Sequence, residues 1–170
     1  MKLGRMIRHV TATHWRTRML FPGTALDAIE QAIARVERTH DGELRFAIET
    51  ALTPLHVWHE IAPHDRALEV FGLLRVWDTD ANNGVLIYVQ LADRHVEIVA
   101  DRGFRGKVSP AEWAAVCRLM EEHFRGGRFQ AGSIAGIEAI GELLARHFPA
   151  RSDPSAHNHN NELPDRPALL

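Results

Sequence analysis

The 170-residue chain has a single cysteine, Cys117, so an internal disulfide bond is excluded. No apolar run approaches the roughly 18 residues of a membrane-spanning helix, so no transmembrane segment is predicted. The formal net charge is only -2, and the sequence lacks the basic clusters of nucleic-acid-binding proteins. Residues 1–18 are basic but have no continuous apolar core, which argues against a secretory signal. We therefore expect a cytoplasmic protein without a nucleic-acid partner.

Several catalytic signatures are also missing. The sequence has no G-x-S-x-G, no phosphate-binding P-loop and no dinucleotide-binding glycine pattern. The length suits one domain with a sizeable core. Hydrophobic residues make up 45% and charged residues 25% of the chain, which is typical of globular proteins.

The chain divides into three regions. Residues 1–20 carry a basic amphipathic pattern and are predicted to form an N-terminal helix that packs on the domain. The alternative for this helix is contact with a membrane surface or a partner. Residues 21–148 alternate between helix and strand patterns. Residues 149–170 are polar and rich in proline, and we predict a disordered tail.

The most apolar run is 85–89, V-L-I-Y-V, and it predicts a strand buried on both faces. A turn follows, and residues 95–101 alternate as the second strand of a hairpin. A further strand is predicted at 43–49, joined to the hairpin through a helix and parallel to one of its strands. Helices are predicted at 24–40, 64–77, 110–125 and 129–148. This order predicts an α/β fold, a three-layer α/β/α sandwich around a small mixed sheet.

Acidic and amide side chains gather at one end of this hairpin. Asp78, Asp80, Asn82 and Asn83 precede the first hairpin strand, and the hairpin should return Asp101 to the same end. Carboxylate and amide oxygens are the ligands that Ca²⁺ and Mg²⁺ take in proteins, so these five residues form a candidate site for weak metal binding. The alternative is a turn in which the side chains bond their own backbone.

A catalytic use of the same end is a separate hypothesis. If the domain is an enzyme, Asp78, Asp80 and Asp101 would hold a metal ion that polarises a phosphoryl oxygen. The alternative for Asp101 is an ion pair with Arg102 or Arg105 at the end of the strand.

Two further groups are candidates for metal or thiol chemistry. His56 and His59 are spaced so that both could bind a transition metal, but neither paired cysteines nor an H-E-x-x-H pattern accompanies them, and we favour a solvated loop. Cys117 lies on the apolar face of its helix and is interpreted as an inert core residue.

Several motifs together resemble the TPM domain family. They are His40-Asp41-Gly42-Glu43-Leu44, Asn82-Asn83-Gly84-Val85-Leu86, Asp93-Arg94, Arg102-Gly103 and the F-R-G-G-R-F-Q-A-G segment at 124–132. The resemblance covers residues 24–148 and implies an α/β/α sandwich. The family includes plant thylakoid-lumen proteins linked to photosystem repair, a nematode modulator of acetylcholine receptors and many bacterial proteins. Some members are acid phosphatases, and others bind divalent cations.

The resemblance also bears on partners. Bacterial members are associated with LemA-type membrane proteins, which implies a protein partner of that kind and a position peripheral to the membrane. A glycine-rich segment of the family is replaced here by residues 100–105, which argues against phosphatase activity. We therefore predict a non-enzymatic TPM-like binding module with weak Ca²⁺ or Mg²⁺ binding. A metal-dependent acid phosphatase is the alternative, and a purely structural, oligomer-forming domain is the third hypothesis.

Overall fold

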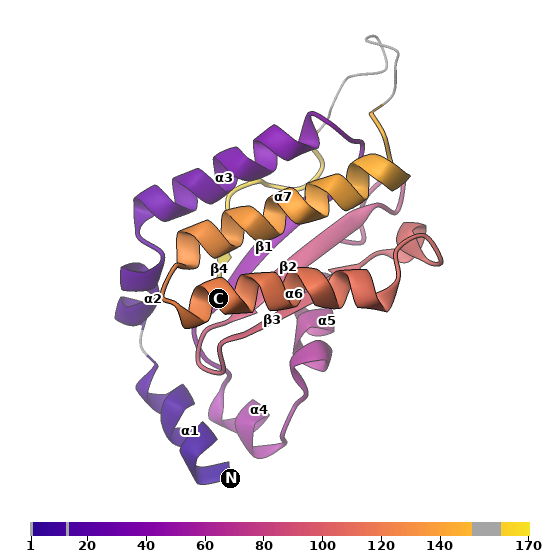
Figure 1. Cartoon of the computed structure of the whole chain (residues 1–170). Coiled ribbons are helices and arrows are strands. Elements are labelled where there is room, and N and C mark those ends of the chain that lie inside the picture. The colour runs from indigo at the N-terminus through magenta and orange to yellow at the C-terminus, as the bar shows by residue number, and fades with distance from the viewer. Residues whose placement is uncertain (1, 13, 151–160) are drawn as a thin grey trace.

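The computed structural model describes residues 2–12, 14–150 and 161–170 (Figure 1). Its elements are α1 (Lys2–Thr11), α2 (His14–Leu20), α3 (Gly23–Glu37), β1 (Glu43–Glu49), α4 (Pro54–Trp58), α5 (Pro63–Leu73), β2 (Gly84–Gln90), β3 (His95–Ala100), the 3-10 turn η1 (Arg102–Phe104), α6 (Pro110–Arg125), α7 (Phe129–His147) and β4 (Ala168–Leu169). None of the helices in these ranges is long and apolar enough to cross a membrane.

The sheet is open and mixed, with the strand order β3-β2-β1-β4. β1 runs parallel to β2 over its whole length, from Glu43↔Gly84 to Glu49↔Gln90. β2 and β3 form the antiparallel hairpin. Every residue of β1 and β2 is buried, as expected of central strands covered on both faces. The predicted strands and the parallel pairing are therefore confirmed.

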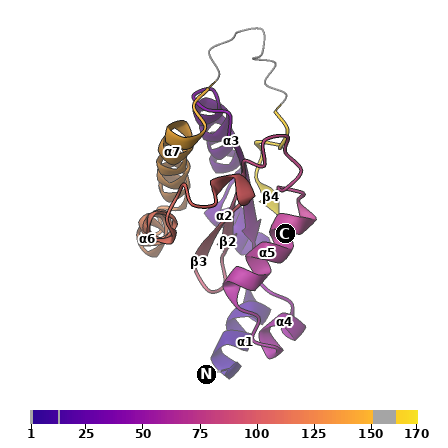
Figure 2. The ribbon, with the colours of Figure 1, turned by 90° about the vertical axis from the view of Figure 1, so that its right-hand side faces the viewer.

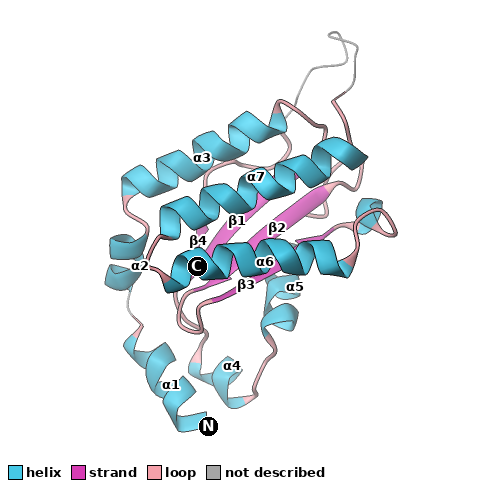
Figure 3. Ribbon diagram, viewed as in Figure 1, coloured by secondary structure: helices cyan, strands magenta, loops and turns pink. Residues whose placement is uncertain are grey.

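Helices cover both faces of this sheet, and the predicted α/β/α sandwich is confirmed (Figure 2). α3, α6 and α7 pack on one face through residues such as Ile33, Met120 and Ile140, which meet Phe46 and Ile87 of the strands. α5 packs on the other face over a smaller apolar cluster. In the face-on view of Figure 3 the strands lie behind α6 and α7.

Local sequence signals set several of these elements. Ser109 and Glu112 form a reciprocal capping box at the start of α6, with the Ser109 N–H donating to Glu112 Oε2 at 2.8 Å. In α7, a Cβ atom at Gly136 would lie 2.3 Å from the sulfur of Met120. Only glycine therefore lets α7 approach α6 this closely, which explains a residue that weakens an isolated helix.

Two predicted boundaries differ from the structure. The predicted N-terminal helix is divided into α1 and α2, and α1 ends at Thr11, a residue type with low helix propensity. The predicted tail at 149–170 is wrong for residues 161–170, which return to the sheet as β4 and bury Leu163. The apolar contact of that leucine outweighs the polar composition that favoured disorder. Residues 151–160 lie outside the described part of the chain.

Candidate functional site

The loops at one end of the sheet bring the motif segments of the chain together. β1 and β2 begin at this end and β3 finishes there. The Asp101 N–H donates to the carbonyl oxygen of Gly84 at 2.9 Å, and the Gly103 N–H donates to that of Asn82 at 2.9 Å. The hairpin therefore returns Asp101 to the 78–83 loop, as expected from its geometry.

Glycine is required at two positions where these loops meet. A Cβ atom at Gly84 would lie 2.0 Å from the carbonyl oxygen of Val76. A Cβ atom at Gly103 would lie 2.4 Å from that of Asn82. Both obstacles are backbone atoms that cannot rotate away, so the glycines fix how closely the loops approach one another.

Asn83 holds the centre of this loop end. Its backbone N–H donates to Thr79 Oγ1 at 3.1 Å, and its side-chain amide donates to the carbonyl oxygen of Asp41. The residue is only 2% exposed, yet its side-chain oxygen has no hydrogen-bond partner among the residues that the structure describes. A buried oxygen without a hydrogen-bond donor is uncommon in folded proteins. Such an oxygen can accept a hydrogen bond from a ligand or coordinate a cation.

Asp101 presents a second such oxygen. One carboxylate oxygen accepts the N–H of Arg102 at 2.6 Å and caps η1. The other oxygen is buried and has no hydrogen-bond partner in the described ranges. Next to it, Asn82 takes a left-handed backbone conformation with φ 53° and accepts the Arg102 Nε–H at 2.8 Å. The left-handed conformation of Asn82 is typical of a turn, as the alternative to metal binding predicts. It occurs beside the side-chain oxygens of Asn83 and Asp101 that lack a donor in the described ranges.

The two remaining predicted ligands point elsewhere. Asp78 forms an ion pair with Arg75 at 2.7 Å, and its side chain is half exposed. Asp80 is exposed, and its backbone N–H donates to the carboxylate of Glu162 at 2.9 Å. Within residues 2–12, 14–150 and 161–170, no three His, Cys, Asp or Glu side chains are placed to hold a metal ion together. Any cation at this end therefore depends on amide and main-chain oxygens as well.

A groove of about 930 Å³ follows the edge of β3, lined by residues of β3, α5 and α6. Asp101 lines it, whereas Asp78 and Asp80 do not, so the three proposed catalytic carboxylates do not share this groove. Burial raises the pKa of the Cys117 thiol to about 12, which keeps this groove residue protonated and unreactive.

Side chains along the same groove form a chain of polar contacts. Glu97 contacts His95 Nε2 at 2.7 Å and His64 Nδ1 at 3.3 Å. The Nδ1 atom of His95 lies 3.1 Å from Glu121, which also accepts the Val96 N–H at 3.2 Å. The last contact occupies one main-chain donor of the edge strand, so that this N–H is not available for pairing with another strand.

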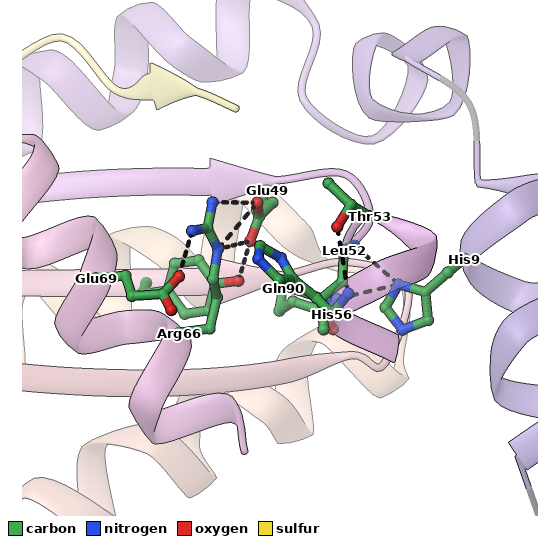
Figure 4. Close-up of polar contacts among 9 residues, drawn as sticks. His9, Glu49, Leu52, Thr53, His56, Arg66, Glu69 and Gln90 are labelled. Atoms are coloured by element: carbon green, nitrogen blue, oxygen red, sulfur yellow. Dashed lines mark hydrogen bonds and ion pairs between the residues drawn. The ribbon is translucent and has the colours of Figure 1, made fainter. Parts of the chain in front are cut away.

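A buried polar network lies at the opposite end of the sheet (Figure 4). Glu49, which is 6% exposed, accepts hydrogen bonds from Arg66 Nη2 at 2.8 Å and Nε at 3.1 Å. The Tyr88 hydroxyl donates to the same carboxylate. Burial and the charge of Glu49 raise the pKa of Tyr88, whereas the hydrogen bonds to Glu49 raise the pKa of Arg66. Tyr88 is therefore a neutral donor and Arg66 a permanent cation.

A second group of polar contacts at this end ties the N-terminal helix to the sheet. His9 of α1 is buried, and its Nδ1 atom accepts the Leu52 N–H at 2.9 Å and lies 3.4 Å from the Gln90 amide. This assigns the proton to Nε2, which lies 3.2 Å from Asp93. Nearby, His56 belongs to helix α4, where its N–H donates to Thr53 Oγ1 at 3.3 Å. His56 and His59 thus lie in and directly after a helical turn instead of in the predicted solvated loop.

The sequence contains a signal for this network that periodicity alone does not register. Glu49 and Gln90 are polar residues at the ends of the two central strands, and Tyr88 is the only tyrosine in the chain. A polar side chain within a buried strand requires a partner, because an unpaired buried group is costly. The partners themselves come from α5 and α1, and no spacing rule identifies them.

The sheet order and the covering helices define an α/β sandwich domain with an open mixed sheet and its loop motifs gathered at one end. A family model described as the TPM domain matches residues 18–143, and the chain belongs to this family. The resemblance drawn from the loop motifs is thereby confirmed.

Two solved structures are similar to this chain. The NMR structure of the BA42 protein from the psychrophilic bacterium Bizionia argentinensis shares 31% identity and superposes with a TM-score of 0.75, over 88% of this chain and 95% of that one. The N-terminal domain of a protein from P. gingivalis shares 20% identity with a TM-score of 0.56, over 79% and 83% of the two chains, and supports the fold alone. No curated protein matches the sequence.

Proposed function

We propose that this TPM domain is a non-enzymatic binding module that takes a divalent cation weakly at the end of the sheet formed by the 78–83 loop and Asp101. The observation that carries the proposal is the side-chain oxygen of Asn83, which is buried and lacks a hydrogen-bond donor among the described residues. The buried oxygen of Asp101, which also lacks a donor there, lies on the neighbouring strand end and supports it.

The donor set suits a hard cation. Amide and carboxylate oxygens are ligands of Ca²⁺ and Mg²⁺, and Ca²⁺ accepts irregular, partly hydrated sites. Asn82, Asn83 and Asp101 are the residues that would hold the ion, with Asp78 and Asp80 at the exposed side of the loop. Only one carboxylate belongs to the buried part of this set, so we expect a dissociation constant in the millimolar range.

Thermal unfolding tests this proposal. With a dissociation constant of ~1 mM, 10 mM Ca²⁺ would stabilise the fold by about 1.4 kcal/mol, which corresponds to an increase in Tm of roughly 3–6 °C. Asp101→Asn should abolish most of this increase, whereas Asp65→Asn, an exposed carboxylate of α5, should leave it unchanged. Equal increases in all three proteins would contradict a specific site.

A second surface supports the role of a binding module. Large apolar side chains are exposed on the first helices of the chain and on α4: Ile7 is 54%, Trp15 70%, Met19 59%, Leu55 63% and Trp58 69% exposed. α1 and α4 lie side by side at one end of the molecule (Figures 1 and 2). Exposed tryptophans among basic residues fit a peripheral contact with a protein or a membrane surface. A LemA-type partner is supported by the family resemblance alone.

The metal-dependent phosphatase, with Asp78, Asp80 and Asp101 as catalytic carboxylates, is the alternative. An assay with p-nitrophenyl phosphate, with and without Mg²⁺, separates the two functions. Our proposal expects no turnover above that of the Asp101→Asn variant. Mg²⁺-dependent turnover that disappears in this variant would favour the enzyme.

A further inference from the structure

Residues 161–170 occupy an edge of the sheet, although they lie outside the residues 18–143 that match the TPM domain model. Their strand β4 runs parallel to β1 (Figure 1, yellow). The Leu170 N–H donates to the carbonyl oxygen of Ile48 at 2.9 Å, and the Thr50 N–H donates to that of Leu170 at 3.3 Å. The segment therefore adds a strand to the family domain in the manner of a peptide ligand.

An apolar anchor holds the start of this segment. Leu163 is 4% exposed and packs against Ala47 of β1 and Ala67 and Val70 of α5. Four positions later, Pro167 is also buried. A leucine pocket next to a strand edge is the arrangement by which strand-adding domains select a side chain.

A buried arginine recognises the main chain of the segment. The guanidinium of Arg45, a residue of β1 that is 9% exposed, donates to the carbonyl oxygens of Pro164 and Arg166. Burial lowers the pKa of Arg45, so these two acceptors help to compensate for its loss of solvent. Carbonyl oxygens are common to all peptides, so this contact does not depend on the sequence of the bound segment.

The acidic side chains of the segment lie among acidic groups of the domain. Glu162 and Asp165 lie beside two carboxylates of the domain, Glu37 of α3 and Glu43 of β1. Burial, followed by the charge of Glu43, raises the pKa of Glu37 to about 9. Burial raises the pKa of Glu43 to about 7, and the charges of Glu162 and Asp165 contribute. Four acids therefore face one another, and Arg45 is the buried cation beside them.

The basic side chain of the segment, by contrast, is matched. Arg166 forms ion pairs with Asp27 at 3.0 Å and with Glu30 at 2.7 Å, both on α3. The domain side of the groove thus presents acidic residues along α3 and β1. It complements a ligand that is neutral or basic where the chain's own segment carries Glu162 and Asp165.

We propose that the β1 edge, the Leu163 pocket and Arg45 form a peptide-recognition groove, which residues 161–170 fill in cis and which a segment of another protein occupies in trans. The preferred segment is extended, has a leucine anchor followed three residues later by an arginine, and carries uncharged or basic residues at the positions of Glu162 and Asp165. This inference rests on the proposed binding role and names its partner class, but it does not depend on the cation site.

Fluorescence polarisation with a labelled peptide, N-Q-L-P-N-R-P-A-L-L, tests the groove. The tethered segment competes at a high effective concentration, so the assay uses the full chain carrying Arg166→Glu, which loses the ion pairs to α3. We expect saturable binding at least tenfold tighter than to the unmodified chain. A peptide with Asp in place of the anchor leucine should bind at least tenfold more weakly, and the native N-E-L-P-D-R-P-A-L-L should bind several-fold more weakly. Adding Arg45→Gln should abolish binding.

Absence of saturable binding to a folded Arg166→Glu chain would overturn the proposal, as would equal binding of the peptide that lacks the leucine. A concentration-dependent dimer without peptide binding would also overturn it, in favour of exchange of the segment between two copies. If Arg166→Glu disturbs folding, exchange of the Leu170 amide in the unmodified chain, with and without peptide, decides instead, because displacement of the segment breaks the hydrogen bond from this amide to Ile48 and lowers its protection. Repeating each titration with 10 mM Ca²⁺ and with a chelator separates this result from that of the cation site.

Discussion

The side-chain amide of Asn83 donates a hydrogen bond to the main-chain carbonyl oxygen of Asp41, and this bond joins the start of β2 to the start of β1. The two residues belong to separate loop motifs, so one side chain links the two loops that precede the central strands at the proposed site.

Asn83→Ala removes this donor and so the buried hydrogen bond to the carbonyl oxygen of Asp41. We expect the free energy of unfolding to fall by about 1–3 kcal/mol, the usual cost of disrupting a buried hydrogen bond. Urea denaturation measures the change. The control is Gln130→Ala, an amide near the start of α7 on the opposite side of the fold from the loop, which should alter stability by no more than about 0.5 kcal/mol. Equal effects would show that Asn83 has no special structural role.

Gly84→Ala should be among the most disruptive small substitutions in the chain. Its Cβ atom would lie 2.0 Å from the Val76 carbonyl oxygen, so the loop before β2 must shift. We expect a loss of at least about 3 kcal/mol in thermal or urea unfolding. Gly72→Ala is the matched control, because nothing lies within 4 Å of the added Cβ in α5. That substitution should stabilise the protein by roughly 0.5–1 kcal/mol.

The ion pair between Glu49 and Arg66 should contribute far more than the exposed pair made by the same arginine. Arg66→Met leaves Glu49 charged and buried beside Tyr88, and we expect a loss of about 3–5 kcal/mol. Glu69→Gln removes only the exposed partner of Arg66 and should cost no more than about 0.5 kcal/mol. Chemical denaturation of both variants tests this ranking, and similar losses would contradict it.

Stability should fall as the pH rises, because the pKa of Glu37 is raised from 4.5 to about 9 in the fold. A carboxyl group with a raised pKa binds its proton more tightly in the folded protein, so its stabilising effect is complete below about pH 4.5 and disappears towards pH 9. The groups that face it are Glu43 of β1 and Asp165 of the C-terminal segment.

Glu37→Gln keeps an acceptor for the Leu44 N–H, which Glu37 binds at 2.8 Å, and removes the titrating charge. We expect the variant to flatten the decline between pH 5 and pH 9, with a gain of about 1–2 kcal/mol at pH 8. Urea unfolding across this range gives the comparison, with Glu122→Gln on the exposed side of α6 as the control. If the free energy of unfolding of the variant declined with pH as steeply as that of the original chain, Glu37 would be excluded as the source of the decline.

Periodicity and capping were sufficient to predict the central fold. The alternating residues at 43–49 and 95–101 and the apolar run at 85–89 matched β1, β3 and β2, with β3 ending one residue early, and Ser109 marked the start of α6. These signals are local, so they can be recognised in the sequence without knowing which distant residues come into contact. β4 was missed because it is only two residues long and follows a polar, proline-rich stretch. Its segment is held by the contacts of Leu163 with α5 and of Arg45 with the main chain, and both partners are distant in sequence.

The candidate site was predicted only in part. Hairpin geometry correctly placed Asp101 beside the 78–83 loop, because register alone decides that position. The directions of Asp78 and Asp80 depend on Arg75 and Glu162, which no spacing rule connects to them. The composition of the loop was enough to make it a candidate site, but the burial of Asn83 could be seen only in the three-dimensional structure.

The central claim is that a divalent cation binds at the end of the sheet where β1 and β2 begin. An NMR titration of the ¹⁵N-labelled chain with Ca²⁺ tests it most directly. We predict saturable shifts of the backbone amides of residues 79–84 and 101–103, with the amides of α6 unchanged and the shifts abolished by Asp101→Asn. Amides that stay unmoved up to ~20 mM Ca²⁺, well above the millimolar dissociation constant expected for so few carboxylates, or that shift uniformly over the whole acidic surface, would contradict the claim.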